Sequence, residues 1–261
     1  MINFQLLKSY IKHRLTAKTR HGVHSPFVYH LIDKVIYDFK PRSDYSEIEL
    51  LRHQLLKDKR FITITDLGAG SHVNNNKQKQ IKQLAKNALK TPKLAQLIYR
   101  LVNEFQPANS IELGTCLGLT TSYLAKAVPK GKIVSIEGCP ETAGVARENL
   151  QSLHIENASI LTGNFDLVFP EVIGGLSSVD LVFIDGNHRK QATLDYFKIC
   201  LDKVNEDSVL IFDDIYWSKG MEEAWEEIKA HPEVTVTVDL FWIGLVFFRK
   251  GQVKEDFKVK F

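Results

Sequence analysis

The chain has 261 residues, of which 44% are hydrophobic and 25% charged, as in an ordinary globular protein. This length and composition exclude a disordered or fibrous chain and allow one large α/β domain or two small ones. The longest apolar run, residues 240–248, is too short for a transmembrane helix. Lys8, Lys12 and Arg14 interrupt the apolar residues at the start, so we expect no secretory signal. With only three cysteines, a disulfide framework is not expected, and we predict a cytoplasmic protein.

The net charge of +3 is mild and does not by itself indicate nucleic-acid binding. The distribution of charge is uneven, because residues 1–40 hold seven Lys or Arg against Asp33 and Asp38, and residues 67–103 hold no acid at all. We therefore predict a basic, mostly helical N-terminal extension over residues 1–105 and a core over residues 106–261.

The extension shows two amphipathic helical patterns. Apolar residues at helical spacing between Ile2 and Leu15 predict a first helix that could lie on a membrane or on a partner subunit, although packing against the protein is favoured. The second pattern, near residues 81–88, carries a lysine ladder for which we favour a solvated face over an anion-binding surface. His21 and His24 are interpreted as structural residues of a turn, because no third ligand completes a zinc site.

From residue 110 onward, β-branched runs alternate with helical spacing, which is typical of βαβ units around a parallel sheet. Helices are predicted at about residues 120–127 and around residues 146–153, 197–204 and 221–228. The predicted parallel strands are residues 110–113, 132–137, 159–162, 180–184 and 208–212. Two further strands, residues 234–239 and 242–249, lie too close together for a crossover helix and should pair antiparallel. The sequence thus predicts an α/β fold with a Rossmann-like seven-stranded sheet and helices on both faces.

Two glycine motifs could each form a turn at which backbone N–H groups approach a ligand. The first, DLGAGS at residues 66–71, is followed by a polar loop. The second, ELGTCLG at residues 112–118, is followed by an apolar helix and then by a strand that ends in Glu137. A carboxylate at that strand end suits the two hydroxyls of a ribose. We favour the second motif as the cofactor loop and interpret the first as a strand end and turn.

The favoured motif lacks the G-x-G-x-x-G pattern of dinucleotide-binding domains, since three residues separate Gly114 from Gly118. Glu112-x-Gly114-x-x-x-Gly118 with Glu137 resembles the S-adenosylmethionine (SAM) signature of class I methyltransferases. The resemblance implies the strand order 3-2-1-4-5-7-6 with the last strand antiparallel.

The resemblance also implies a role for each residue of the cofactor site. Phe165 could equally be a core residue, but an aromatic face beside an amide suits adenine. The implied contacts are Glu112, Gly114, Thr115 and Gly118 with the methionine part of SAM, Glu137 with its ribose, and Gly163, Asn164 and Phe165 with its adenine.

Three acidic residues end two strands that are expected to be neighbours. Asp185 follows residues 180–184, whereas Asp213 and Asp214 follow residues 208–212. Neighbouring strands lie about 4.8 Å apart, and crowded carboxylates repel one another unless a hard cation binds them. We predict Mg²⁺ there, with Ca²⁺ or Mn²⁺ as alternatives. One or two of these acids could instead only cap the loops that follow.

Over residues 80–250 this constellation resembles the cation-dependent O-methyltransferases of the catechol, caffeoyl-CoA and macrocin or novobiocin sugar types. The resemblance implies that Asp185, Asp213 and Asp214 hold the metal, and that Asp185 also borders the cofactor and the reacting atoms. Some sugar-type members have a second acid where this chain has Asn187. His188 is therefore predicted to be the base that takes a proton from the substrate hydroxyl. The alternative is that Asn187 or His188 only caps the following helix.

These observations predict a SAM-dependent methyltransferase that O-methylates a small hydroxylated molecule with the help of a divalent metal. A homodimer is one option by resemblance, and the sequence does not identify the methyl acceptor. The alternatives are a metal-independent N- or O-methyltransferase and a non-catalytic protein that binds a cofactor, or binds RNA through the basic residues 1–105.

Overall fold

The computed structural model describes residues 4–65 and 77–261, so the DLGAGS motif at residues 66–71 lies outside the described residues. The chain divides into two compact units. Unit 1 comprises residues 1–38 and 176–261, and unit 2 comprises residues 39–175. Because these units mix the expected extension with the expected core, the functional division near residue 105 stays a prediction.

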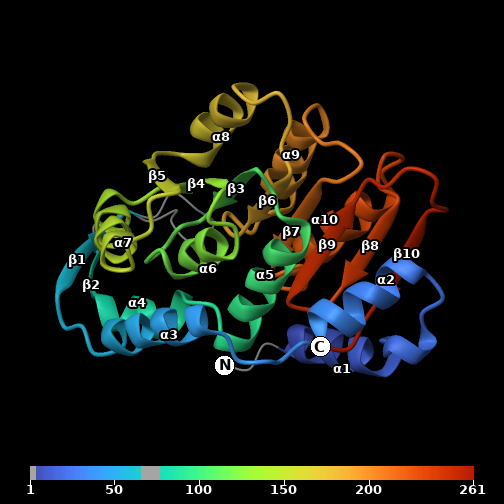
Figure 1. Ribbon diagram of the computed structural model, residues 1–261, viewed down its shortest axis with the longest axis horizontal. Coiled ribbons are helices and arrows are strands. Elements are labelled where there is room, and N and C mark those ends of the chain that lie inside the picture. Colours follow the sequence, from blue (N-terminus) through green and yellow to red (C-terminus); the bar gives the residue numbers. More distant parts are fainter. Residues whose placement is uncertain (1–3, 66–76) are drawn as a thin grey trace. The chain divides into compact units, whose positions relative to one another are not determined.

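Unit 2 contains three parallel strands, and Figure 1 shows α8 on one side of them and α6 on the other. Pro140 occupies the first turn of α7, and the Asn164 side chain caps α8 by accepting a hydrogen bond from the Asp166 N–H. In spatial order the strands are β3 (Asn109–Leu113), β4 (Lys132–Glu137) and β5 (Ala158–Thr162), and the helices are α6 (Leu119–Ala127), α7 (Pro140–Ser152) and α8 (Phe165–Gly174).

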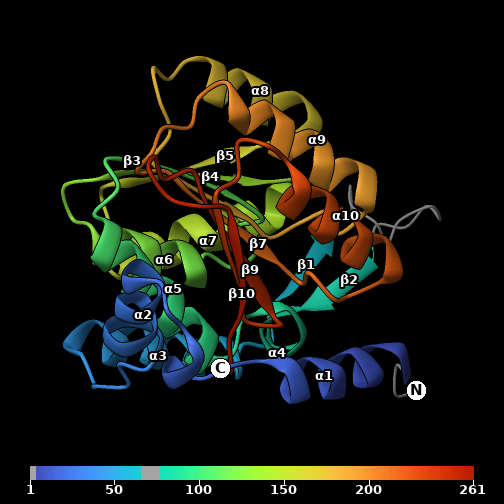
Figure 2. The same cartoon turned by 90° about the vertical axis from the view of Figure 1, so that its right-hand side faces the viewer.

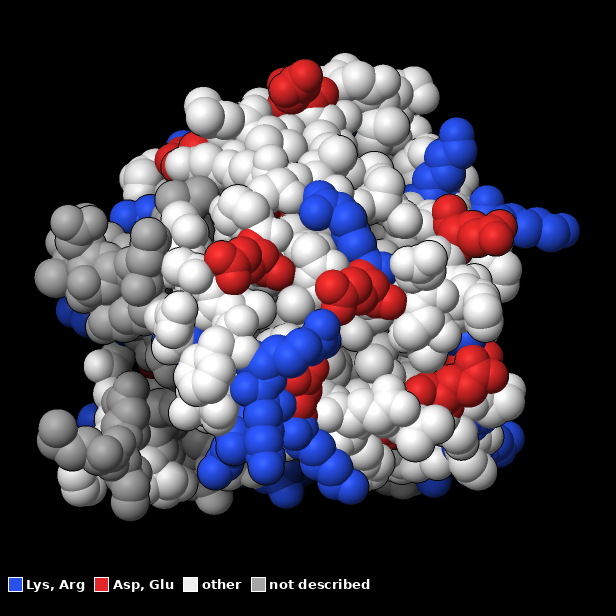
Figure 3. All heavy atoms as spheres, turned by 90° about the vertical axis from the view of Figure 1, so that its left-hand side faces the viewer, with Lys and Arg blue, Asp and Glu red and all other residues white. Residues whose placement is uncertain are grey.

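The earlier part of unit 2 is helical apart from one hairpin. Its elements are α3 (Ser43–Leu55), β1 (Phe61–Ile64), β2 (Lys77–Gln80), α4 (Ile81–Ala88) and α5 (Pro92–Phe105), with β1 and β2 antiparallel. Lys79, Lys86 and Lys93 are exposed, as expected for solvated lysines. On the side of the molecule that Figure 3 shows, acidic side chains lie beside Lys and Arg side chains, so that side does not present one sign of charge.

Unit 1 contains the strands at which the three predicted metal ligands lie. Its strand order is β6 (Leu181–Ile184), β7 (Val209–Asp213), β9 (Ile243–Phe247), β8 (Val236–Asp239) and β10 (Glu255–Lys258). β9 is antiparallel to both β7 and β8, which is the pairing expected for the last two predicted strands. The prediction of seven strands is wrong by one, because β10 adds a parallel strand beside β8.

Two helices of unit 1, α9 (Lys190–Leu201) and α10 (Lys219–Ala230), pack on the same face of its strands, as Figure 2 shows. Phe212 of β7 contacts the rings of both Phe197 in α9 and Trp225 in α10. Gly244 of β9 is necessary there, because a Cβ at this position would lie 2.6 Å from the Trp225 indole. Burial of these large rings stabilises the part of the sheet that carries Asp213.

The N-terminal segment of unit 1 consists of α1 (Phe4–Thr16), a 3₁₀ turn (Arg20–Gly22), α2 (Pro26–His30) and a π-helix (Leu31–Ile36). His21 and His24 are both exposed, and α2 packs on β9 through the rings of Phe27 and Phe247, 5.0 Å apart. Within residues 4–65 and 77–261, no helix combines the length and the apolar character that a membrane crossing requires.

Candidate active site

The loop between β3 and α6 is shaped by residues with positive φ. Gly114 has φ +104°, Cys116 has +49° and Gly118 has +77°. A side chain at Gly118 would also be crowded, because its Cβ would lie 3.1 Å from the Cβ of Ala146. Gly118 is the N-cap of α6 and has no side chain that could accept the first N–H groups of this helix, so a polar ligand can accept them there.

Glu112 supports this loop from inside the protein. Its side chain is fully buried, and Oε2 accepts hydrogen bonds from the hydroxyls of Thr121 (2.5 Å) and Ser135 (2.6 Å). The hydroxyl of Thr115 lies 2.5 Å from that of Ser135, in the same network. The side chains of Glu112 and Thr115 therefore orient the loop, and the backbone of the loop is what it presents to a ligand.

Glu137 ends β4 and joins the loop to the start of α7. Its Oε2 accepts a hydrogen bond from the Cys116 N–H (2.8 Å), and its Oε1 accepts one from the Cys139 N–H (2.9 Å). Each oxygen of a carboxylate can accept a second hydrogen bond. Glu137 is half-buried, at the strand end where the resemblance implies a contact with the two ribose hydroxyls.

The segment after β5 is closely packed. A Cβ at Gly163 would lie 2.6 Å from Cγ2 of Val168, which explains the glycine. The Oδ1 of Asn164 accepts the Asp166 N–H at 2.8 Å, so this side chain starts α8. Phe165 is half-buried, whereas Phe169 of the same helix is fully buried and occupies the core position. The Phe165 ring is therefore partly accessible to a ligand.

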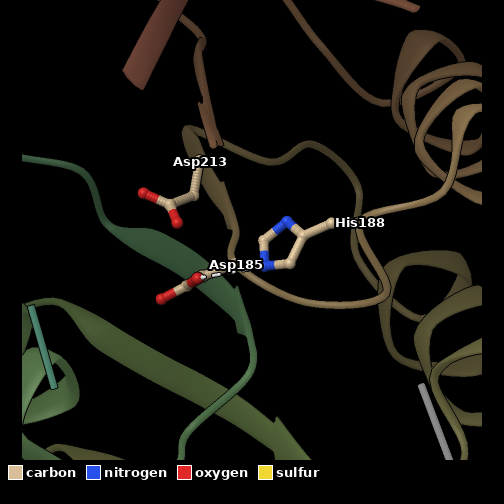
Figure 4. Close-up of side chains that lie close together, drawn as sticks. All are labelled: Asp185, His188 and Asp213. Carbon is tan, nitrogen blue, oxygen red and sulfur yellow. Dashed lines mark ion pairs between the residues drawn. The ribbon is translucent and has the colours of Figure 1, made fainter. Parts of the chain in front are cut away.

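Two of the three metal residues predicted in unit 1, Asp185 and Asp213, converge at the ends of two paired strands. β6 and β7 are parallel with Ile184 opposite Phe212, so Asp185 and Asp213 follow at the same edge. Figure 4 shows Asp185, His188 and Asp213 with their side chains directed towards one another. One ligand atom of each lies within 4.8 Å of the others, and Asp213 is only 1% exposed.

His188 lies between two carboxylates. Its Nε2 is 3.8 Å from Oδ1 of Asp185 and 3.9 Å from Oδ2 of Asp214. Asp214 follows β7 with φ +53°, and its N–H donates to the carbonyl of Trp242 at 2.8 Å. The structure thus groups His188, rather than the predicted Asp214, with Asp185 and Asp213, and it leaves Asp214 in contact with the imidazole.

The helix-capping alternative for Asn187 and His188 is wrong. α9 begins at Lys190, and its N-cap is Arg189, which makes no side-chain cap hydrogen bond. Asn187 has φ +50° and is buried; its amide N–H donates to the Tyr196 hydroxyl (2.9 Å), and its Oδ1 accepts from Nε of Arg189 (2.7 Å). Tyr196 and Arg189 hold the loop that carries His188, and no sequence motif marked either of them.

The donor set fits a divalent cation. The carboxylates of Asp185 and Asp213 are ligands that Mg²⁺, Mn²⁺ and related ions accept, and a cation between them would offset their repulsion, with the His188 imidazole beside it.

Comparison with known proteins agrees with this architecture. Residues 111–215, which run from β3 to just beyond β7, match a protein family described as a methyltransferase domain. This part of the chain is therefore similar to a methyltransferase domain, which is the class that its glycine and acid motifs predict.

The chain is also similar to catechol O-methyltransferases. It is 27% identical over 128 residues to the protein of Niastella koreensis, covering 48% of this chain and 57% of the relative. It is 28% identical over 145 residues to that of Mycobacterium tuberculosis, covering 52% of this chain and 64% of the relative. The chain thus spans less than two thirds of the length of either protein.

A solved structure shows the same fold over nearly the whole chain. The O-methyltransferase TomG from Streptomyces achromogenes, in complex with SAM, aligns with a TM-score of 0.56 at 18% sequence identity. The alignment covers 89% of this chain and 99% of TomG.

Proposed function

We propose that this protein transfers the methyl group of SAM to an oxygen atom of a small hydroxylated molecule, assisted by a divalent cation. The observation that carries the proposal is the convergence of Asp185, His188 and Asp213 at the ends of neighbouring strands in a chain with a methyltransferase domain. Asp185 and Asp213 are the proposed metal ligands, with Asp214 as a further one, and Asp185 also borders the cofactor.

In unit 2 the proposed cofactor contacts come from both backbone and side chains. The loop of residues 114–118 offers N–H groups to the methionine part of SAM, and Glu137 accepts hydrogen bonds from the ribose hydroxyls. Asn164 and the partly accessible ring of Phe165 border the adenine. When bound, SAM supplies an activated methyl group, and the cation favours the ionised form of the acceptor hydroxyl.

His188 is the proposed proton acceptor. An imidazole at this position can take the proton of the acceptor hydroxyl, and the carboxylates of Asp185 and Asp214, 3.8 and 3.9 Å away, stabilise the imidazolium that results. Tyr196 and Arg189 keep the loop of His188 in place through Asn187. The protein contributes mainly orientation and charge, because methyl transfer between two bound molecules requires no covalent enzyme intermediate.

Calorimetric titration tests the cofactor, and an acceptor panel tests the reaction. We expect the protein to bind SAM and not NAD, and to methylate at least one member of a panel of catechols, sugars and cell extracts. Tight binding of NAD without binding of SAM would overturn the proposal, and so would transfer to amine acceptors alone.

The substitution His188→Gln tests whether His188 acts as a proton acceptor or as a metal ligand. For a base, we expect turnover to fall about 10²–10⁴-fold, with little change in the affinity for Mn²⁺ measured by electron paramagnetic resonance. A large loss of Mn²⁺ affinity would instead make His188 a metal ligand and contradict its role as the proton acceptor.

A further inference from the structure

The first helix of unit 1, α1, has one side held against its unit and an opposite side that is apolar and exposed. The held side carries His13 and Ser9: His13 is 2% exposed and 3.0 Å from Oδ1 of Asp239, and the hydroxyl of Ser9 donates to Glu222 at 2.8 Å. These two contacts determine which side of α1 faces its unit. The opposite side of the helix therefore faces away from the unit.

The outward side is a continuous apolar stripe. Its members recur every three or four residues, which aligns them along one side of a helix. They are Phe4 (81% exposed), Leu7 (44%), Ile11 (51%) and Leu15 (81%). In Figure 2, α1 is seen along its length, and no other element of unit 1 covers its lower side. A shallow hollow of about 480 Å³ runs along the stripe and is lined by its four side chains together with Lys8, Lys12 and Thr16.

Basic residues flank the stripe on both sides. Lys8 and Lys12 lie on one side of it and Arg14 on the other, and all three are exposed. The sequence contains no acidic residue before Asp33. Lysine stems can lie along an apolar surface while their ammonium groups reach into a polar layer. An apolar stripe whose charged neighbours are all cations is complementary to a surface with acyl chains beneath a layer of negative headgroups.

We propose that α1 docks this protein on lipid bilayers that contain anionic headgroups. The helix lies in the plane of the interface, with Phe4, Leu7, Ile11 and Leu15 among the upper acyl chains and its basic residues beside the lipid phosphates. This interaction goes beyond the proposed methyl transfer and does not depend on it.

A second copy of this chain fits the stripe less well than a bilayer does. Pairing two α1 stripes would bring the basic residues of one copy close to the identical residues of the other, with no acid on either helix. A stable dimer also buries about 800 Å² on each partner, whereas α1 spans only about 20 Å. A bilayer has neither restriction, because it is continuous and carries the opposite charge.

Cosedimentation of the full chain with vesicles tests the proposal. One set of vesicles is phosphatidylcholine alone, and the other is phosphatidylcholine and phosphatidylserine in equal parts. We expect binding to the second set that weakens as salt is raised. Lys8→Glu with Lys12→Glu should lower the partition coefficient about 25-fold or more, since each basic residue near such a surface contributes roughly a fivefold factor. Phe4→Gln with Leu15→Gln should lower it by more than about tenfold.

Matched variants control for changes elsewhere. Lys59→Glu with Lys130→Glu makes the same charge change at exposed positions of unit 2, and Val253→Gln alters an apolar side chain that is 87% exposed. Both should bind as the unaltered protein does, and all variants should keep its thermal unfolding midpoint.

Three results would overturn the proposal. The first is the absence of binding to both sets of vesicles. The second is binding that the α1 variants do not change. The third is light scattering that shows a dimer which Phe4→Gln with Leu15→Gln converts to a monomer, because the stripe would then be an interface between copies.

Discussion

The strand ends of the two units use acidic side chains in opposite ways. In unit 2, the carboxylate of Glu112 accepts hydrogen bonds from hydroxyls inside the protein, and that of Glu137 accepts them from backbone N–H groups. In unit 1, Asp185 and Asp213 converge with His188 on one point. One unit thus uses carboxylates to shape a backbone loop, whereas the other places them where their charges need a cation.

This contrast predicts which property each substitution affects. Carboxylates that hold a loop contribute to folding free energy, because their removal leaves buried donors without acceptors. Carboxylates brought close to one another repel, cost folding free energy and are retained for binding. Substitution of Glu112 or Glu137 should therefore mainly lower stability, whereas substitution of Asp185 or Asp213 should mainly lower activity.

The largest effect is expected for Asp213→Asn in unit 1. Loss of this carboxylate should lower methyl transfer about 10³-fold, because a bound cation contributes several kcal/mol of charge stabilisation. The affinity for SAM, measured by calorimetry, and the thermal unfolding midpoint should change little. Asp207→Asn, at an exposed turn of the same unit, is the control and should retain full activity. Unchanged turnover in Asp213→Asn would refute the role assigned to unit 1.

Glu112→Gln should show the reverse pattern in unit 2. The amide presents an N–H₂ group where the hydroxyls of Thr121 and Ser135 now donate, so we expect a loss of about 1–3 kcal/mol in the free energy of unfolding. Urea unfolding measures this loss. Unchanged stability together with greatly weakened SAM binding would show that Glu112 contacts the ligand itself.

Asp239 lies in unit 1 but is hydrogen-bonded like Glu112, so it is an exception to the contrast between the units, and its structural role can be tested through pH. Burial alone would raise the pKa of Asp239, but hydrogen bonds from His13 and Tyr216 outweigh burial and lower the pKa below its ordinary value of 3.8. The ionised carboxylate therefore stabilises the fold above pH 3.8, and this contribution is lost as the pH falls through the lowered pKa.

Asp239→Asn should accordingly cost about 1–3 kcal/mol at neutral pH. The difference from the unaltered protein should shrink below pH 3.8 in urea unfolding measured across that range. A difference that stays constant with pH would contradict the assignment.

The smallest effect is expected for Gly118→Ala. Its φ of +77° and the approach to Ala146 should make this substitution cost about 1–2 kcal/mol and weaken SAM binding. Gly144→Ala is the matched control, because a Cβ there meets nothing within 4 Å and the residue lies inside α7. The control should stabilise the protein by about 0.5–1 kcal/mol. If both substitutions changed the free energy of unfolding by the same amount, the loop at Gly118 would not be strained, in contradiction to this account.

Most core elements were predictable, because hydrophobic periodicity and turn signals agree there. β4 has the predicted bounds, Lys132–Glu137, and α6 begins one residue before its predicted start. α8 was not predicted, because Pro170 interrupts its helical pattern and Leu167, an apolar residue, is 74% exposed. β10 was missed because only Phe257 of its four residues is buried.

The site was predictable in part. Asp185 and Asp213 lie together because each follows a strand of the same parallel pair, which the sequence pattern indicates. His188 lies beside them in a loop whose direction depends on the positive φ of Asn187 and Asp214. At these two residues the backbone leaves the extended conformation of a strand. No periodicity marks such a backbone conformation in a non-glycine residue.

The metal dependence of methyl transfer tests the central claim most directly. Transfer of an isotopically labelled methyl group from SAM to a cell extract or to the acceptor panel would be followed with Mg²⁺ present and with EDTA in excess. We predict that EDTA abolishes transfer, that added Mg²⁺ restores it, and that SAM binding is nearly intact throughout. Full transfer in EDTA would contradict the metal role of Asp185 and Asp213.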